Sequence, residues 1–162
     1  MVWICCVLTN DDEKLHIVFD QEIQELATVN KQTKEEAYNR LKRTYDGYHF
    51  THDTQGLYTP FSILWALSER RYGSYWFSTG TPTYLVELIK KANFNIEELS
   101  DYEGEEQLSS VHVDGIDPIP VLYQSGYLTI KDFDEEFRLY TLNYPNEEVK
   151  SSHSTPKYKP HK

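Results

Sequence analysis

The chain has 162 residues, a formal net charge of −10 at pH 7 and an aromatic content of 14%. This length suits one compact domain, and so many large aromatic side chains exclude a mostly disordered chain. The negative charge argues against nucleic acid as a partner, because it repels phosphate backbones. The apolar run at residues 1–8 is too short to span a bilayer and lacks signal-peptide features. The adjacent Cys5 and Cys6 cannot cross-link distant parts of the chain by a disulfide bond, which favours a reducing, cytoplasmic location.

Two helices are expected in the first third of the chain. Residues 9–13 form an acidic, capped start, and apolar residues then recur at helical spacing. A second start at Thr33 and Glu36 has the T-x-x-E pattern of a capping box, and Asp46–Gly47 predicts the end of that helix. Residues 49–58 are expected to form a loop or a short hairpin.

Two Thr-Pro pairs, Thr59–Pro60 and Thr81–Pro82, predict two further helices, because the hydroxyl can cap and proline suits the first helical position. Apolar residues cover more than one face of the first helix, which predicts burial on most sides. The second carries a single apolar stripe within residues 85–92. The acidic stretch at 97–106 is expected to be a solvated loop, since it lacks the spacing of a calcium-binding loop.

The last third changes from helical to strand-like patterns. Asp117–Pro118 opens a short helix that Ser125–Gly126 ends. Residues 127–131 and 137–142 then alternate as two strands do, with a polar turn between them. A helix followed by such a hairpin is the outline of a winged-helix module. Asn146 begins another helix signal, but the tail that follows is polar and basic, so no helix is expected there.

These patterns predict an α+β protein that is mainly α, a helical domain with a C-terminal winged-helix-like element and a short two-stranded hairpin. The common catalytic motifs are absent, including phosphate-binding loops and the zinc-binding H-E-x-x-H. His49, His52 and Asp53 form an H-x-x-H-D cluster, for which surface histidines are a simpler interpretation than a metal site. No catalytic residue, metal ligand or cofactor is therefore assigned.

Aromatic residues gather between Tyr45 and Phe77, where a core or a domain interface is the favoured interpretation. Five ordered motifs covering roughly residues 10–150 resemble the predicted AAA-ATPase-like family that is frequent in gut Bacteroidetes. They are Y-D-G-Y-H-F at 45–50, Y-T-P-F-S-I-L at 58–64, Y-W-F-S-T-G-T-P-T-Y-L at 75–85, L-Y-Q-S-G-Y-L-T-I at 122–130 and Y-T-L-N-Y-P-N-E-E-V at 140–149. The motif residues expected to be structural are Tyr45, Asp46, Gly47, Tyr48, Phe50, Pro60, Phe61, Trp76, Phe77, Thr79, Gly80, Thr81 and Pro82. The two glycines that are expected to supply backbone freedom are Gly47 and Gly80.

In that family a P-loop ATPase domain precedes this region, and a PD-(D/E)XK nuclease-like domain commonly follows it. Positions matching the family's nucleotide-binding lysine and nuclease carboxylates are absent here. The resemblance implies a non-catalytic fragment that packs beside an ATPase core, with the ATPase and nuclease-like domains as its partners. Its expected parts are an apolar stub at 1–9, a helical lid-like region at 10–105, a winged-helix-like region at 106–150 and a disordered basic tail at 151–162.

Three alternatives stay open. The first is a DNA-binding winged helix that uses the hairpin at 127–142 with Lys131, Arg138, Lys150 and the basic tail. The second is an enzyme that holds a metal at the H-x-x-H-D cluster. The third is an interaction module or homo-oligomer that associates through the aromatic surface.

Overall fold

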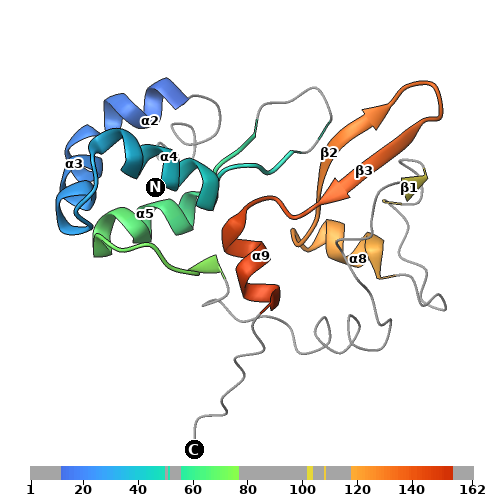
Figure 1. The fold of residues 1–162 in the computed structure, drawn as a ribbon. Coiled ribbons are helices and arrows are strands. Elements are labelled where there is room, and N and C mark those ends of the chain that lie inside the picture. Colours follow the sequence, from blue (N-terminus) through green and yellow to red (C-terminus); the bar gives the residue numbers. More distant parts are fainter. Residues whose placement is uncertain are drawn as a thin grey trace, which may run out of the picture.

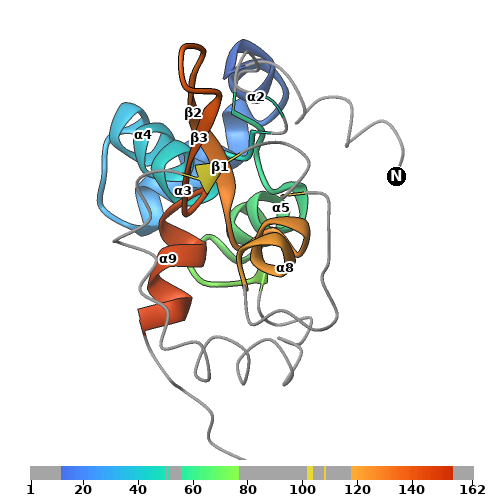
Figure 2. The same ribbon diagram turned by 90° about the vertical axis from the view of Figure 1, so that its right-hand side faces the viewer.

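The computed structural model describes residues 12–49, 51, 56–76, 102–103, 108 and 118–154. In chain order the elements are α2 (Asp12–Val18), α3 (Asp20–Val29), α4 (Lys34–Tyr45), α5 (Pro60–Glu69), β1 (Tyr102–Glu103), α8 (Ile119–Gln124), β2 (Thr129–Asp134), β3 (Leu139–Asn143) and α9 (Glu147–Ser154). Helices with a small antiparallel sheet confirm the predicted α+β, mainly α class. In Figure 1, α2 to α5 lie on one side, α8 and the β2–β3 hairpin lie on the other, and α9 stands between them. Figure 2 shows the same elements from the side of α8 and the hairpin.

Helices α2 to α5 surround the first of two hydrophobic clusters. The sequence pattern predicted one helix where the structure has α2 and α3, because the chain bends at Phe19 (φ −113°, ψ 26°). The bend lets Phe19 pack on the cluster, while Val18 stays 50% exposed. The buried residues of the first cluster are Leu15, Ile23, Leu26, Ala27, Ala37, Tyr38, Leu41, Tyr45, Tyr58, Ile63, Ala66 and Leu67.

Helix α4 begins with the predicted capping box. The Thr33 hydroxyl accepts the Glu36 N–H at 3.2 Å, and the Glu36 carboxylate accepts the Thr33 N–H at 2.7 Å. The helix ends at Tyr45, and Asp46 after it is extended. Beyond this end Tyr48 and Leu57 form an antiparallel bridge, which agrees with the predicted loop or short hairpin.

Removing this cap is expected to destabilise the protein. Thr33→Ala leaves the Glu36 N–H without its acceptor in the first turn of α4, so the free energy of unfolding should fall by about 1 kcal/mol. Urea denaturation followed by circular dichroism measures the change. Thr28→Ala on α3 is the matched control, because the Thr28 hydroxyl donates to the Gln24 carbonyl of its own helix and does not cap a helix start. An equal loss in both variants would contradict the capping role.

Helix α5 differs from its prediction in two respects. Pro60 occupies the first turn as expected, but the side chain of the N-cap residue Thr59 makes no capping hydrogen bond. The helix is also not buried on most sides, because Phe61 and Trp65 are 42% and 43% exposed. Lying four positions apart, they share one face, with ring centroids 6.1 Å apart, while Ile63 is fully buried. An aromatic strip therefore runs along the outside of α5.

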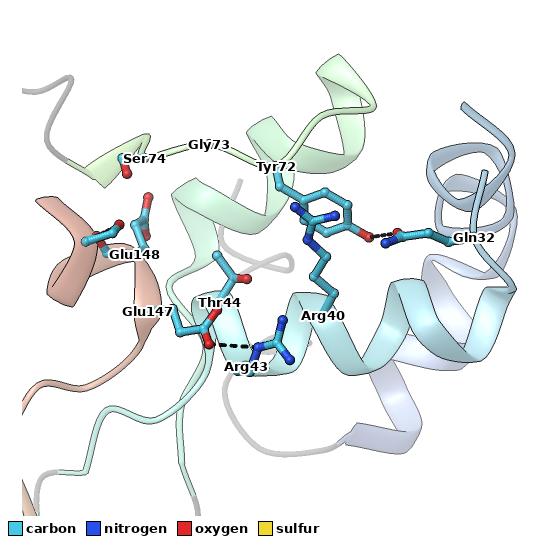
Figure 3. Close-up of a pocket in the computed structure, with 10 residues that line it drawn as sticks. Gln32, Arg40, Arg43, Thr44, Tyr72, Gly73, Ser74, Glu147 and Glu148 are labelled. Atoms are coloured by element: carbon cyan, nitrogen blue, oxygen red, sulfur yellow. Dashed lines mark hydrogen bonds and ion pairs between the residues drawn. The ribbon is translucent and has the colours of Figure 1, made fainter. Parts of the chain in front are cut away.

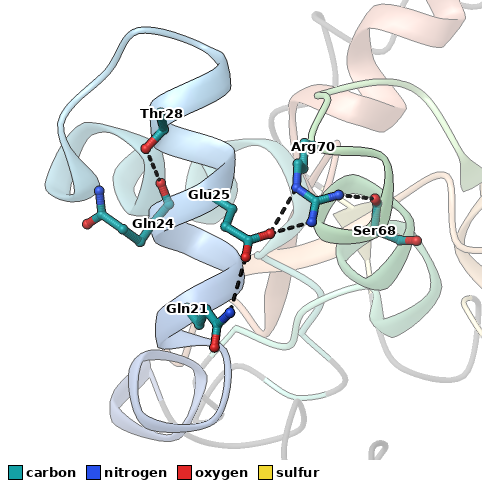
Figure 4. A network of polar contacts seen from close by, with 6 residues as sticks. All are labelled: Gln21, Gln24, Glu25, Thr28, Ser68 and Arg70. Carbon is teal, nitrogen blue, oxygen red and sulfur yellow. Dashed lines mark hydrogen bonds and ion pairs between the residues drawn. The ribbon is translucent and has the colours of Figure 1, made fainter.

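An exposed polar network joins α3 to the end of α5 (Figure 4). Arg70, which ends α5, has a φ of +52°, a left-handed conformation that residues other than glycine rarely adopt. Its guanidinium donates to the Glu25 carboxylate through Nη2 and through Nε at 2.9 Å, and Gln21 donates to the same carboxylate. These bonds, chiefly those from Arg70, lower the pKa of Glu25. Asn30 also donates to the Arg70 carbonyl at 3.1 Å, so the turn after α5 is held from α3.

The second cluster lies among α8, the sheet and α9. The sheet order is β1-β3-β2, with all neighbours antiparallel, so the predicted hairpin of β2 and β3 is confirmed. The polar turn lies at residues 135–138 rather than at 132–136, because Asp134 still pairs with Leu139. The Asp134 carboxylate then accepts the N–H groups of Glu136 and Phe137, each at 2.9 Å. The buried residues of the second cluster are Leu108, Ile119, Leu122, Tyr127, Leu128, Ile130, Leu142, Tyr144 and Val149.

Two further segments correct the sequence predictions. Tyr102 and Glu103 form strand β1 inside the acidic stretch that was expected to be a loop, because the free edge of β3 offers backbone partners. A helix also follows Asn146, where none was expected. The Asn146 carboxamide oxygen accepts the Val149 N–H at 3.1 Å, and α9 continues to Ser154, into the predicted tail. A two-turn helix carries too few residues to show an apolar stripe.

Some predictions concern residues outside the described ranges. They are the stub at 1–9, the helix start at Asn10, Phe50, His52, Asp53, the helix at 82–92 and the residues after 154. Within the described ranges, the structure contains no helix with the length and apolar character required to cross a membrane.

Candidate functional site

The two clusters meet at Glu148, in the first turn of α9. One oxygen of its carboxylate, Oε1, accepts the Ser62 hydroxyl of α5 at 2.9 Å. The same oxygen accepts the backbone N–H groups of Tyr75 at 2.6 Å and Trp76 at 2.9 Å. Because Glu148 is only 2% exposed, these bonds are shielded from water and are stronger than surface ones. Glu148 therefore fastens α9 to α5 and to the chain that follows α5.

Burial also changes the acidity of this group. Loss of hydration raises the pKa of Glu148 above its ordinary value, and the bonds from Trp76, Ser62 and Tyr75 offset part of that effect. Since the donors would be left unsatisfied without it, Glu148 is a polar group of the core with a structural task.

The segment from Tyr45 to His49 crosses between the clusters at the same junction. The Tyr45 hydroxyl donates to the Gly73 carbonyl and accepts the Gly73 N–H, both at 3.0 Å. The Tyr48 hydroxyl donates to the Gly126 carbonyl at 3.1 Å, on the side of the second cluster. Desolvation raises the pKa values of both tyrosines, so each hydroxyl remains a neutral hydrogen-bonding group. The two tyrosines thus anchor the segment from Tyr45 to His49, one on the side of each cluster.

Gly47 lies in the middle of this crossing, with a φ of +115°. A Cβ atom at Gly47 would lie 2.2 Å from the carbonyl oxygen of Pro145, which is backbone and cannot rotate away. Lys131 Nζ donates to the carbonyls of Gly47 at 3.1 Å and Pro145 at 3.0 Å, so it ties the two chain segments together. The burial that accompanies these contacts lowers the pKa of Lys131.

A pocket of about 380 Å³ opens beside the junction, between α4, residues 72–74 and α9 (Figure 3). Arg40 and Arg43 of α4 both line it, from positions one helical turn apart. Arg43 Nε pairs with the Glu147 carboxylate at 2.8 Å. The Arg40 guanidinium lies over the Tyr72 ring, with its central carbon 4.0 Å from the ring centroid. The lining is mostly polar and comes from Gln32, from α4, from residues 72–74 and from α9.

The structure describes some, but not all, of the motif residues that were expected to be structural. Tyr45, Asp46, Gly47 and Tyr48 lie at the junction, and Pro60 and Phe61 open α5. The Trp76 ring packs edge-on against Tyr127, with centroids 5.0 Å apart. The remaining motif residues, Phe50, Phe77, Thr79, Gly80, Thr81 and Pro82, lie outside the described ranges.

Neither the central role of Glu148 nor the contact of Arg40 with Tyr72 was predicted from the sequence. A glutamate in the first turn of a helix is ordinarily a solvated partner of the helix dipole, so its sequence position gave no sign of burial. Arg40 and Tyr72 are too far apart in sequence to be linked by any local pattern.

The histidine cluster is only partly described. The His49 N–H donates to the Thr129 hydroxyl at 2.7 Å, and that hydroxyl donates to the His49 carbonyl at 2.8 Å. The backbone of His49 therefore helps to join the clusters, while His52 lies outside the described ranges. Across the described part of the chain, no three or more His, Cys, Asp or Glu side chains gather in a manner that could hold a metal ion.

Comparison with known proteins gives one informative similarity. The chain is 34% identical over 117 residues to a protein of Azotobacter chroococcum mcd 1 named "Uncharacterized protein in vnfD 5'region". The match spans 70% of this chain but 22% of the relative, so the chain covers about a fifth of that protein's length. No family model matches the chain. No solved structure matches it either.

Proposed function

We propose that this chain is the helical and winged-helix part of an AAA-ATPase-like protein, where it packs beside an ATPase core and does not itself catalyse a reaction. The observation that carries the proposal is the aromatic strip of Phe61 and Trp65 on α5. Trp65 is extended by Tyr75, whose ring stacks on it with centroids 6.3 Å apart. Partly exposed aromatic groups of this kind suit burial against another protein domain.

The tight junction supports the same proposal. Because Glu148, Tyr48 and Thr129 bond across it, the two clusters form one body that could respond as a unit to a neighbouring domain. The much greater length of the Azotobacter relative leaves room for such a domain in that protein. We also propose a cytoplasmic location, because the adjacent Cys5 and Cys6 cannot link distant parts of the chain by a disulfide bond.

Two features of the hairpin disfavour the alternative of a DNA-binding winged helix. Lys131 was a candidate for phosphate contact, but its ammonium donates to the Gly47 and Pro145 carbonyls. Exposed carboxylates surround the hairpin turn and would repel a phosphate backbone. They belong to Asp132, Asp134, Glu135 and Glu136.

The packing proposal predicts binding to a P-loop domain taken from a full-length AAA-ATPase-like protein. In a pull-down, the double variant Phe61→Ser, Trp65→Ser should lower the affinity at least about tenfold, because buried aromatic anchors dominate interface energies. Phe137→Ser is the matched control, since Phe137 is 67% exposed but lies at the hairpin turn. Circular dichroism would confirm that all variants fold.

Three results would count against the packing proposal. One is P-loop domain binding that is equal in the double variant and the control, and another is no binding at all. The third is ATP hydrolysis by the purified chain above a buffer control. A shift of duplex DNA at low salt would instead favour the winged-helix alternative.

A further inference from the structure

We propose that the pocket between α4, residues 72–74 and α9 binds an oxyanion, the phosphate or carboxylate group of a small molecule, with Arg40 as its principal contact. A volume of about 380 Å³ lies at the lower end of the range of ligand pockets, enough for an anionic group with a small organic part. Such binding would be an activity separate from the packing of α5 on another domain.

Arg40 is positioned to bind an anion. Its guanidinium lies over the Tyr72 ring, a cation–π contact that does not use up the N–H donors of the arginine. Among the described residues, no carboxylate forms an ion pair with Arg40. The arginine is half-buried, so its charge is less screened than that of a surface residue. Figure 3 shows the guanidinium facing Tyr72 above α4.

The Tyr72 ring, over which Arg40 lies, is itself held in place by hydrogen bonds. The Tyr72 hydroxyl donates towards the Gln32 side-chain oxygen at 3.2 Å and the Ala37 carbonyl at 3.3 Å. These bonds fix the ring between α4 and the residues before it. A guanidinium on a fixed ring loses less conformational entropy when it binds than one on a free side chain.

The pocket offers more donors than acceptors. Of its two carboxylates, Glu147 pairs with Arg43, and Glu148 accepts the N–H groups of Tyr75 and Trp76 through one oxygen, Oε1. Arg43, which pairs with Glu147 through Nε at 2.8 Å, lines the pocket together with Arg40. Further hydroxyl groups of the lining come from Thr44 and Ser74. Because two arginines and hydroxyl groups line the same pocket, the chemistry fits the oxygens of phosphate or carboxylate.

Calorimetric titration of the full chain with inorganic phosphate, and separately with acetate, tests the site at constant ionic strength. Phosphate is expected to bind, and Arg40→Gln should weaken it at least about tenfold. Arg40→Lys should lose part of the affinity, since it keeps the charge but not the planar fork. Lys42→Gln is the matched control, because Lys42 is an exposed cation of α4 outside the pocket lining.

The outcomes separate the sources of the anion. Binding of phosphate alone assigns a phosphate site, and binding of acetate with the same dependence on Arg40 assigns a carboxylate site. Equal affinities in Arg40→Gln and Lys42→Gln would overturn the proposal, as would the absence of binding by both anions. Circular dichroism of Arg40→Gln and Arg40→Lys distinguishes loss of the site from loss of the fold. None of these results depends on whether α5 packs against another domain.

Discussion

Replacing Gly47 by alanine is expected to lower the free energy of unfolding by about 3–5 kcal/mol, because strain and overpacking add at this position. Gly47 has a φ of +115°, which side chains with a Cβ atom strongly disfavour. The added Cβ would also lie 2.2 Å from the Pro145 carbonyl oxygen, so the chain segments around Gly47 and Pro145 would have to move apart. Urea denaturation monitored by tryptophan fluorescence measures this loss.

Two other glycines provide graded controls. Gly126 has a φ of +79°, but its added Cβ would meet the nearest atom, in the Trp76 ring, at 3.4 Å. Gly126→Ala is therefore expected to lose about 1–2 kcal/mol through backbone strain. At Gly73 φ is not positive and the nearest atoms to an added Cβ belong to the Tyr75 side chain, at 3.2 Å, so the loss in Gly73→Ala should be smaller still. If Gly47→Ala were no worse than Gly126→Ala, the close approach at Pro145 would not be what requires glycine.

Removing the Glu148 carboxylate is expected to have the second large effect. Glu148→Ala leaves the N–H groups of Tyr75 and Trp76 and the Ser62 hydroxyl without their acceptor, which should lower the free energy of unfolding by about 3 kcal/mol. Glu148→Gln retains one oxygen at nearly the same place, so it should lose about 1 kcal/mol at neutral pH. Equal losses in the two variants would mean that packing volume, rather than hydrogen bonding, matters at this position.

The comparison of wild type with Glu148→Gln also predicts a dependence on pH. The pKa of Glu148 is raised in the folded state, so folded protein binds this proton more tightly than unfolded protein does. Between the ordinary pKa of a glutamate and the raised one, falling pH therefore favours the folded state. The stability of wild type relative to Glu148→Gln should rise as pH falls through this window, and a difference that does not change with pH would contradict the raised pKa.

The parts of the fold that were predictable have local causes. The capping box at Thr33 and Glu36 joins residues three positions apart, and the β2–β3 hairpin shows its alternation within one short stretch. Helix α9 was not predictable in this way, because its stability depends on Glu148 contacting residues of α5 and the chain after it. The exposure of Phe61 and Trp65 was missed because composition shows that a helix is apolar but not which neighbours are present to cover it.

In the candidate site, too, the features with local causes were predictable and the contacts between distant residues were not. Tyr45, Gly47 and Tyr48, which the sequence motif at 45–50 contains, all lie at the junction. The pocket could not be assembled from the sequence, because Arg40 and Tyr72 come from different parts of the chain. Composition shows how many charged and aromatic residues the chain has. Whether a particular arginine lies over a particular ring depends on how α4 packs against the chain after α5.

The position of Glu148 also bears on how the protein folds while it is synthesised. The acceptor for Ser62 lies 86 residues further along the chain, so it does not exist when α5 has been made. Until α9 emerges, the first cluster must be held by apolar packing and by its own short-range bonds. Closing a loop of that length costs about 4 kcal/mol of chain entropy, which the junction has to offset. A ribosome-bound chain that stops before Glu148 should therefore hold the Tyr75–Trp76 backbone open to hydrogen exchange, and completion of α9 would protect it.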